Sequence, residues 1–444
     1  MHFKSFTRST AGLIFSLLFL LAAFAGPALA KSNGDASRSS NTPGLSELSV
    51  SPTTLTCKQL RRRLPLQLRP QPTACALGPP PTTSAMFVSD SGNARVLEYL
   101  ANESPPFFTT GMSAEVVFGQ PDFTSSAHNL TQTGMSKPES AALDGSGDMW
   151  SADFDYGRVL EFVPPFTRPP STDSANLVIG EPDFTTNNTY NPPQPTQSNL
   201  SGGAVGVAFD GTCNMYVSDF RSNRVLQFIA PFSNGMNANL VFGQSDFTSF
   251  GTDDSLSGLQ GPQLINFDNS GNLWVADYGN DRVLEFVPPF TVPPSTNSAN
   301  LVITLVSKSP SSYLHRPFGV AFDACGDLWV SDTNNRVLEF LPPYTNGANL
   351  VIGQSDLSGD APGAGPAGLS DPRAVAFDSA GYLYVTDYGN NRVMIFVPPF
   401  TTGMKARYVI GQPDLMTTTP TTTATGLTSP QGVTISPWVF PNRL

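Results

Sequence analysis

Histidine, cysteine and charge are all scarce in this chain of 444 residues. It has three histidines and four cysteines, and charged residues make up 13% of it. No CxxC pair occurs, which excludes a zinc-ribbon or RING-type site. No G-x-S-x-G, H-E-x-x-H or P-loop pattern occurs either, so no familiar nucleophile, zinc-protease or phosphate-binding motif is present.

Helical periodicity is also lacking, whereas glycine and proline are plentiful, at 38 and 41 residues. Such a composition is typical of many short strands joined by turns. We therefore expect an all-β fold.

A long apolar run occurs once, from Ala11 to Gly26, after the basic residues Lys4 and Arg8. The small residues around Ala28–Ala30 resemble a cleavage site, so we expect residues 1–30 to be a signal peptide. The alternative is a retained N-terminal anchor. We expect a secreted, periplasmic or cell-envelope protein, with no membrane span after the signal segment.

The formal net charge is −11. An acidic surface repels phosphate backbones, which makes nucleic acid an unfavourable partner. Residues 31–83 are rich in proline and serine and poor in apolar residues, so we expect a flexible tether there.

Export permits disulfide bonds. Cys57 and Cys75 are neighbours in the tether and form the favoured pair. Cys213 and Cys325 fall in equivalent turns two repeats apart, and we expect them to exceed the Cα separation of about 7 Å that a disulfide tolerates.

One sequence motif recurs along the chain. LWVADYGNDRVLEFVPPF at 273–290 has relatives that begin at Met86, Met149, Met215, Leu328 and Leu383. A full unit has four short segments rich in Val, Ile, Phe and Trp, as in FGVAFD, LWVSD, RVLEF and NLVIGQ. Each segment is bounded by Gly, Asn, Asp or Pro, which predicts a strand.

Six units of four strands predict a six-bladed β-propeller of four-stranded antiparallel blades over residues 84–436. The first unit lacks its leading strand, and the last is followed by an unmatched one, PQGVTIS at 430–436. We expect the C-terminal strand to join the first blade and close the ring, because closure removes exposed sheet edges. Residues 437–444 remain as a C-terminal tail.

Every unit carries an Asp and an Arg around a tight turn. The pairs are Asp90 and Arg95, Asp153 and Arg158, Asp219 and Arg224, Asp277 and Arg282, Asp332 and Arg336, and Asp387 and Arg392. Because the pair recurs in every unit, we interpret it as structural. An Arg fork bonded to the Asp carboxylate and to loop carbonyls would lock the turn.

The repeat resembles that of the NHL-repeat propellers. The resemblance rests on the pattern G-x-A-F-D followed by G-N-L-[WY]-V-[SA]-D-x-x-N-x-R-V-x-x-F, clearest at 319–340 and 375–396. It implies a scaffold whose activity the fold does not determine. Relatives that are lyases use several histidines, but only His128 and His315 follow the signal segment. Relatives that are lactonases hold calcium in the channel, and the channel strands offer Asn266 and few other polar groups.

Long connections between units differ from one another and are rich in Thr, Ser, Asn and Gly. We expect them to form a binding face beside the Asp–Arg turns, because variable loops on a rigid frame commonly carry function. The aromatic residues predicted there are Phe154, Phe220, Tyr278 and Tyr388, and packing against neighbouring blades is an equal alternative. Asp253 and Asp254 lack the spacing of a calcium loop and are read as a solvated turn.

These observations favour an exported, monomeric, non-catalytic binding or scaffolding module for a protein, peptide or glycan, without a resident cofactor. The alternative is a metal-dependent lyase or lactone hydrolase with calcium or zinc at the channel mouth. A third hypothesis is a structural surface protein without a discrete ligand.

Overall fold

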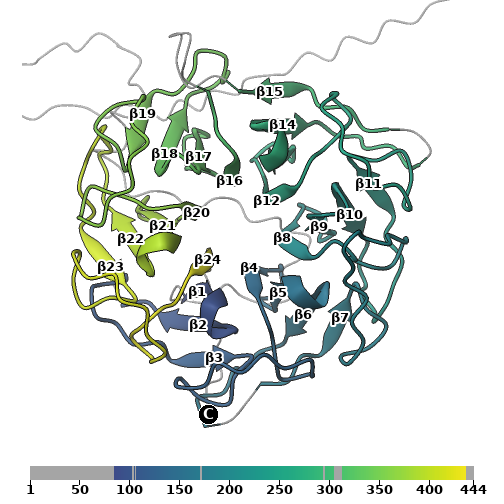
Figure 1. Ribbon diagram of the computed structural model, residues 1–444, viewed down its shortest axis with the longest axis horizontal. Coiled ribbons are helices and arrows are strands. Elements are labelled where there is room, and N and C mark those ends of the chain that lie inside the picture. The colour runs from purple at the N-terminus through teal and green to yellow at the C-terminus, as the bar shows by residue number, and fades with distance from the viewer. Residues whose placement is uncertain are drawn as a thin grey trace, which may run out of the picture. The chain divides into compact units, whose positions relative to one another are not determined.

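The computed structural model describes residues 85–436, apart from 103–104, 106, 171–172, 294–295 and 305–312. These residues form six four-stranded antiparallel sheets arranged as the blades of a ring (Figure 1). The predicted six-bladed β-propeller is confirmed. The predicted signal peptide, tether and tail lie outside the described residues. Within the described part of the chain, none of the helices has the length and hydrophobicity that crossing a membrane requires.

The first three blades occupy the N-terminal half of the ring. Blade 1 consists of β24 (Pro430–Ser436), β1 (Ala85–Asp90), β2 (Arg95–Leu100) and β3 (Val116–Phe118). Blade 2 consists of β4 (Pro138–Leu143), β5 (Met149–Asp153), β6 (Arg158–Phe162) and β7 (Leu177–Ile179). Blade 3 consists of β8 (Ala204–Phe209), β9 (Met215–Asp219), β10 (Arg224–Phe228) and β11 (Leu240–Phe242).

The remaining blades follow the same order from the inner to the outer strand. Blade 4 consists of β12 (Pro262–Phe267), β13 (Leu273–Asp277), β14 (Arg282–Phe286) and β15 (Leu301–Ile303). Blade 5 consists of β16 (Pro317–Phe322), β17 (Leu328–Asp332), β18 (Arg336–Phe340) and β19 (Leu350–Ile352). Blade 6 consists of β20 (Pro372–Phe377), β21 (Leu383–Asp387), β22 (Arg392–Phe396) and β23 (Tyr408–Ile410).

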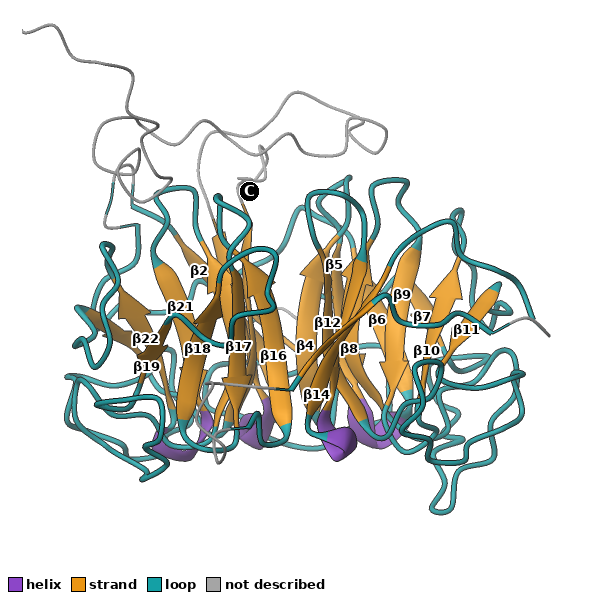
Figure 2. Cartoon of the chain, turned by 90° about the horizontal axis from the view of Figure 1, so that it is seen from above, coloured by secondary structure: helices purple, strands orange, loops and turns teal. Residues whose placement is uncertain are grey.

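Short 3-10 turns follow the second strand in four blades. They are η1 (Ser91–Asn93), η2 (Phe154–Tyr156), η3 (Tyr278–Asn280) and η4 (Tyr388–Asn390). Figure 2 shows them along one edge of the ring, together with the long connections between blades. We call this side the loop face. The opposite side carries the turns between first and second strands, and we call it the turn face.

The C-terminal strand β24 closes the ring as predicted. It pairs antiparallel with β1, with Met86 opposite Ile435 and Phe87 opposite Thr434. The chain's last strand thereby supplies the inner strand that the first unit lacks. Every blade consequently has four strands, and the inner edge of blade 1 is covered.

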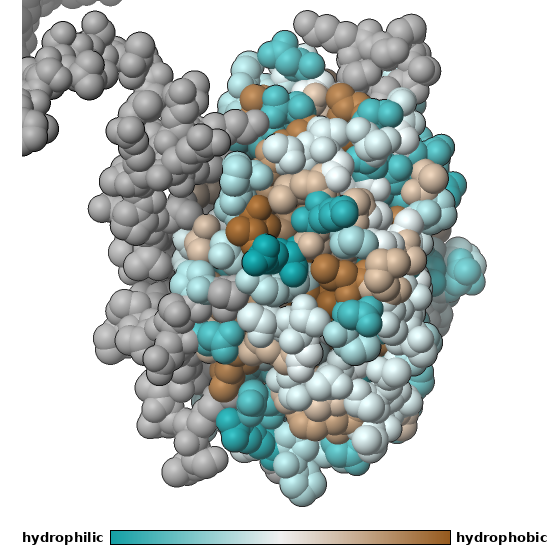
Figure 3. Space-filling view, turned by 90° about the vertical axis from the view of Figure 1, so that its left-hand side faces the viewer, coloured by the Kyte–Doolittle hydropathy of each residue, from teal (hydrophilic) through white to brown (hydrophobic). Residues whose placement is uncertain are grey.

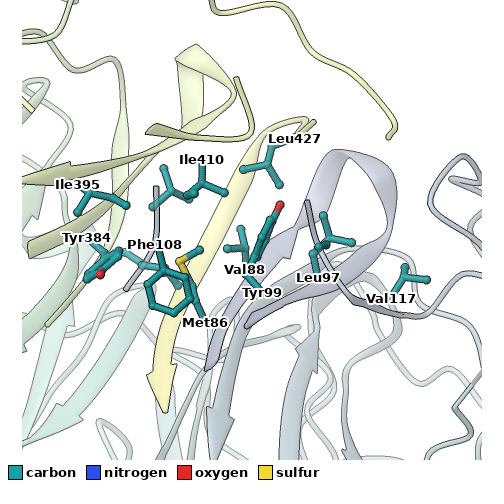
Figure 4. Close-up of a cluster of buried hydrophobic side chains, with 14 residues drawn as sticks. Met86, Val88, Leu97, Tyr99, Phe108, Val117, Tyr384, Ile395, Ile410 and Leu427 are labelled. Atoms are coloured by element: carbon teal, nitrogen blue, oxygen red, sulfur yellow. The ribbon is translucent and has the colours of Figure 1, made fainter. Parts of the chain in front are cut away.

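The hydrophobic core is divided among the interfaces between adjacent blades. Six clusters of buried side chains occur, and each draws its residues from two neighbouring blades. The cluster drawn in Figure 4 joins blade 6 to blade 1, with Tyr384 and Ile395 on one side and Met86, Val88 and Tyr99 on the other. Burial of apolar area between blades is thus what holds the ring together.

A repeated aromatic pair lies at every blade interface. An aromatic residue near the start of each second strand contacts the aromatic residue that follows the third strand of the next blade. The pairs are Phe87 with Phe166, Trp150 with Phe232, Tyr216 with Phe290, Trp274 with Tyr344, Trp329 with Phe400, and Tyr384 with Phe108. Their interplanar angles, 71° to 86°, are edge-to-face arrangements that aromatic quadrupoles favour. The recurrent aromatic after Pro-Pro is therefore a link between blades.

The outer wall carries no large apolar patch in the view of Figure 3, on the side where β19 and β23 lie. Hydrophobic residues form small separate patches among polar ones there. Scattered apolar residues of this kind are normal for a protein surface.

Cys213 and Cys325 lie in the turns before β9 and β17, and both are disulfide-bonded. The predicted Cys57–Cys75 pair lies outside the described residues and stays a prediction.

Candidate functional site: the loop face

The Asp–Arg pairs lie at the ends of the second and third strands, where the chain turns on the loop face. In blade 3, Asp219 pairs with Arg224 across the β9–β10 register, and the two side chains are fully buried. Arg224 Nε donates to Asp219 Oδ2 over 2.9 Å. Burial raises the pKa of the Asp219 carboxyl, and the Arg224 charge opposes this rise.

The residue just before each Arg adopts a left-handed backbone. It is Asn223, Asn335 or Asn391 in blades 3, 5 and 6, with φ of 52° to 58°. Asn tolerates this conformation because its short side chain hydrogen-bonds locally. In these blades the Asn amide also donates to a carbonyl of the following long connection, Phe250, Asp360 or Thr418.

In five blades the guanidinium group binds the long connections on both sides of its blade, whereas the acceptors of Arg282 all lie in the preceding connection. Arg158 donates to the carbonyls of Thr131 and Gly134 in the preceding connection and of Phe184 in the following one. The equivalent acceptors are Thr423, Gly426 and Phe123 for Arg95, and Thr196, Asn199 and Phe247 for Arg224. They are Asp254, Ser255 and Gly258 for Arg282, Tyr313 and Leu357 for Arg336, and Gly365, Gly368 and Leu415 for Arg392.

Each of these contacts is between a charged donor and a backbone carbonyl, and such bonds are stronger than neutral ones. An Arg therefore fixes the backbone of two connections, or of one in blade 4, whatever side chains they carry. The same device in each blade leaves the side chains of the connections free to differ.

A glutamine after the outer strand provides a second anchor. Gln120, Gln244, Gln354 and Gln412 each donate to two carbonyls, one in the Asp–Arg turn and one seven residues ahead. Blade 2 has Glu181 here instead, and its carboxylate accepts from the backbone and side-chain amides of Asn188. Burial raises the pKa of Glu181 to about 7. Sequence reasoning missed this role of the GQ ending, although its recurrence was visible.

An Asp two residues after that glutamine, or after Glu181 in blade 2, begins the connections that follow blades 1, 2, 3, 5 and 6 with a capped turn. Asp122, Asp183, Asp246, Asp356 and Asp414 each accept backbone N–H groups two and three residues ahead. Such turns mimic backbone turns and hold the chain's direction. The connections thus begin alike and diverge afterwards.

Several large apolar side chains are exposed on these connections. They are Tyr190, Phe250, Leu256, Tyr313 and Met416, between 40% and 66% exposed. Tyr190 and Phe250 also line a hollow of about 790 Å³ with Glu181, Asn188 and the prolines of 192–195. The hollow lies between the connections that follow blades 2 and 3.

The four aromatic residues predicted for this face lie in the turns beside the channel. Phe220 contacts Phe154 and Tyr278, with ring centroids 6.1 Å and 6.3 Å apart. Tyr278 and Tyr388 are half-buried, and Arg316 and Arg373 lie over their rings. Phe154 follows the alternative of packing against a neighbouring blade, since it is 7% exposed and Lys137 and Arg221 also pack against it.

The two histidines occupy opposite blades of the ring. His128 Nδ1 lies 2.7 Å from Ser136 Oγ, which donates to Asp155. His315 Nδ1 lies 2.8 Å from Thr333 Oγ1. They belong to blades 2 and 5, so the structure does not bring them together.

The central channel contains a cavity of about 300 Å³ lined by the inner strands. Its lining is mainly aliphatic and aromatic, as at Val207, Ile265 and Phe322. Asn266 donates to the Val320 carbonyl and Ser140 to the Val205 carbonyl, so these polar side chains link adjacent inner strands. Of the two groups of three potential metal ligands among the described residues, neither lines this cavity.

Asp253 and Asp254 belong to the connection before blade 4. The Asp253 carboxylate accepts from the backbone and hydroxyl of Ser255, and the Asp254 carbonyl accepts from Arg282. Both residues therefore shape a turn.

The fold and the anchored loops define a six-bladed β-propeller with one elaborated face. The NHL repeat model matches residues 369–396, within one of six blades built alike, which supports the resemblance to NHL-repeat propellers. The resemblance seen in the sequence is confirmed. No curated protein matches the chain in sequence.

Solved propellers are similar in fold only. A protein of unknown function from Bacteroides caccae is 10% identical, covering 79% of this chain and 98% of that one, with a TM-score of 0.45. A proposed 6-phosphogluconolactonase from Bacteroides uniformis is 14% identical, covering 80% and 100%, with a TM-score of 0.44. A catalytically inactive virginiamycin B lyase from Staphylococcus aureus with quinupristin is 10% identical, covering 72% and 82%, with a TM-score of 0.38.

Proposed function

We propose that this protein is an exported binding module that holds a protein, peptide or glycan on its loop face. The observation that carries the proposal is the contrast between anchoring and variation in the long connections. Arg, Gln and Asp side chains fix their backbones in the same way from blade to blade, while their exposed side chains differ. A surface ordered in advance loses less conformational entropy on binding.

The hollow beside Tyr190 and Phe250 is the best-formed place for a ligand on this face. Both rings are about two-fifths exposed, with Tyr190 at 41% and Phe250 at 40%. Rigid aromatic side chains supply large contact area at low entropic cost, and binding hot spots are enriched in them. The polar residues Asn188, Gln194 and Thr196 also line the hollow.

The metal-dependent lyase or lactonase alternative needs a polar group of ligands in the channel or at its mouth. The channel residues that the structure describes are mostly apolar, and Asn266 and Ser140 are engaged with backbone carbonyls. These observations favour binding over catalysis in the channel. Elemental analysis of the purified protein, with assays against cyclic depsipeptides and lactones, tests the alternative directly.

The binding proposal is tested with immobilised peptide and glycan arrays. The double variant Tyr190→Ala/Phe250→Ala should lose binding by roughly tenfold or more, since hot-spot truncations cost at least about 2 kcal/mol. The matched control is Val163→Ala, which is also exposed, at 43%, but follows the third strand at the turn face. Equal losses in both variants, or no array binding by the wild type, would contradict the proposal.

Export belongs to the same proposal, because residues 1–30 have the pattern of a signal peptide. N-terminal sequencing of protein recovered outside the cytoplasm should give a start near Lys31. An intact N-terminus would instead support a retained anchor. Light scattering of the same sample tests the proposed monomer.

A further inference from the structure

The turn face of blade 2 carries a group of three carboxylates that the proposed binding function does not use. Asp144 and Asp148 lie in the β4–β5 turn, and Glu161 lies on the third strand, β6. One carboxylate oxygen from each lies within 4.8 Å of the others. Asp144 and Asp148 are half-buried, so the group is reached from solvent, whereas Glu161 is buried beneath them.

The Glu161 carboxylate is the observation that points to a ligand. It is 92% buried, since its exposed fraction is 8%. Among the described residues no donor bonds it, and the charges beside it are those of Asp148 and Asp144. Buried carboxylates in proteins are normally paired, hydrogen-bonded or bound to metal, because desolvating an uncompensated charge is costly.

Other blades show how the same position is satisfied without an ion. In blade 4 the residue equivalent to Asp148 is Asn272, whose amide donates to both Asp268 and Glu285, over 2.9 Å each. In blade 3, Asn214 bonds Asp210, and the Glu is replaced by Gln227, which bonds Tyr216. Blade 2 has neither substitution. Its Asn176 accepts from the Val163 N–H through Oδ1, and among the described residues its side-chain amide makes no bond to the Glu161 carboxylate.

We propose that Asp144, Asp148 and Glu161 bind a divalent cation of the calcium class at the turn face of blade 2. Three carboxylates at this separation can surround one ion with oxygen atoms, and calcium accepts six to eight such ligands, including water. In blade 4 the Asn272 amide links the turn to the third strand by donating to Asp268 and Glu285. In blade 2 the ion would link the turn to the third strand through its positive charge. Asp144 also accepts from the Trp150 indole over 3.1 Å, which fixes one ligand.

That indole gives the site its own optical reporter. Trp150 is fully buried and bonded directly to a proposed ligand, so terbium bound in calcium's place should be sensitised by excitation of this tryptophan. Titration of metal-depleted full-length protein with calcium by calorimetry and with terbium by luminescence measures binding. Asp148→Asn rebuilds the blade 4 arrangement, and it should weaken binding at this site by about tenfold or more.

Two further variants keep the test decisive. Glu161→Gln copies blade 3 and should also lose binding, which covers the case where Asp148→Asn misfolds. Asn272→Asp gives blade 4 three carboxylates and should create a second terbium signal through Trp274, which is bonded to Asp268. Absence of that gain would contradict the rule that a third carboxylate completes the site.

The comparison variant in blade 5 is Asp327→Asn. Asp323, Asp327 and Glu339 form a similar group there, but the Asn349 amide donates to Glu339, so we expect no ion at that group. The proposal is supported if calcium binding survives Asp327→Asn and is lost in Asp148→Asn. It is overturned if the wild type binds no calcium at millimolar concentration, or if Asp148→Asn binds as the wild type does while Asp327→Asn does not.

Discussion

Val433 in the C-terminal strand lies opposite Val88 in the first strand of the ring. The pairing joins residues from the two ends of the described chain into one sheet. Val433 also belongs to the apolar cluster between blades 1 and 6, with Tyr384 and Leu427. The strand therefore contributes both backbone hydrogen bonds within blade 1 and apolar contact with blade 6.

Removal of this strand should open the ring. A chain that ends after Ser429 lacks β24, so the edge of β1 is exposed and blade 6 loses part of its partner surface. We expect loss of a single cooperative thermal transition, because each blade's stability depends on both neighbours. Circular dichroism melting checks this. A chain that ends after Ser436 keeps β24 and is the control, and equal melting of the two would show that the pairing is dispensable.

The aromatic contact between Tyr384 and Phe108 joins blade 6 to blade 1 through side chains. Phe108 is fully buried, and its ring lies 5.8 Å from that of Tyr384 in an edge-to-face arrangement. Phe108→Ala should lower the free energy of unfolding by about 3–5 kcal/mol. The neighbouring Phe107 is only partly buried, so Phe107→Ala should cost less in the same denaturant titration. Similar losses would contradict a special role for the pair.

The sequence predicted the architecture well because the repeat records it in every blade. The strand order and the number of blades follow from the four segments in each unit. The closing strand follows from the segment that the first unit lacks and from PQGVTIS after the last unit. The aromatic after Pro-Pro was equally visible, but its partner lies on the second strand of the preceding blade. Contacts between repeats cannot be read from a pattern within a single repeat.

The candidate site was less predictable for the same reason. The Asp–Arg pairs stood out because they recur, whereas the acceptors of Arg158 are backbone carbonyls, which any sequence supplies. For Phe154 the sequence left exposure and packing against a neighbouring blade as equal alternatives, and the structure shows a buried ring with Lys137 and Arg221 against it. The acidic group of blade 2 differs from that of blade 4 at one position, where blade 2 has Asp148 and blade 4 has Asn. The sequence does not show that Asp148 lies beside Glu161, because the two residues come from different parts of the blade.

The Asp–Arg pairs should be essential to stability. Arg224→Ala would leave Asp219 buried without its charge partner and the Thr196, Asn199 and Phe247 carbonyls without a donor. Breaking a buried pair in this way costs about 3–5 kcal/mol. Arg224→Lys should recover only part of the loss, because one ammonium cannot reproduce the planar fork.

The control for this prediction is the exposed pair Arg168–Glu115, with side chains 63% and 36% exposed. Arg168→Ala should change the free energy of unfolding by less than about 1 kcal/mol. Chemical denaturation of both variants checks the comparison. A loss at Arg224 no greater than at Arg168 would mean that the locked turns do not stabilise the ring.

The acidic group of blade 2 should make stability fall as pH rises toward neutrality in buffer freed of metal ions. Burial, with Asp144 nearby, raises the pKa of Asp148 to about 7, and burial with both aspartates raises that of Glu161 to about 7. Unfolded Asp and Glu titrate near 4. Between about pH 4 and 7 the folded chain therefore holds more protons than the unfolded chain, so the free energy of unfolding decreases across this window and levels off above it.

Asp148→Asn should flatten that decrease, because the amide carries no charge and can donate to Glu161 as Asn272 does to Glu285. Denaturant titrations between pH 5 and 8 in chelator measure the slope for both proteins. Asp122→Asn is the control, since hydrogen bonds from Thr124 lower the pKa of the exposed Asp122 and move its titration below the window. Parallel curves for the wild type and Asp148→Asn would show that the three carboxylates do not share their protons in the folded ring.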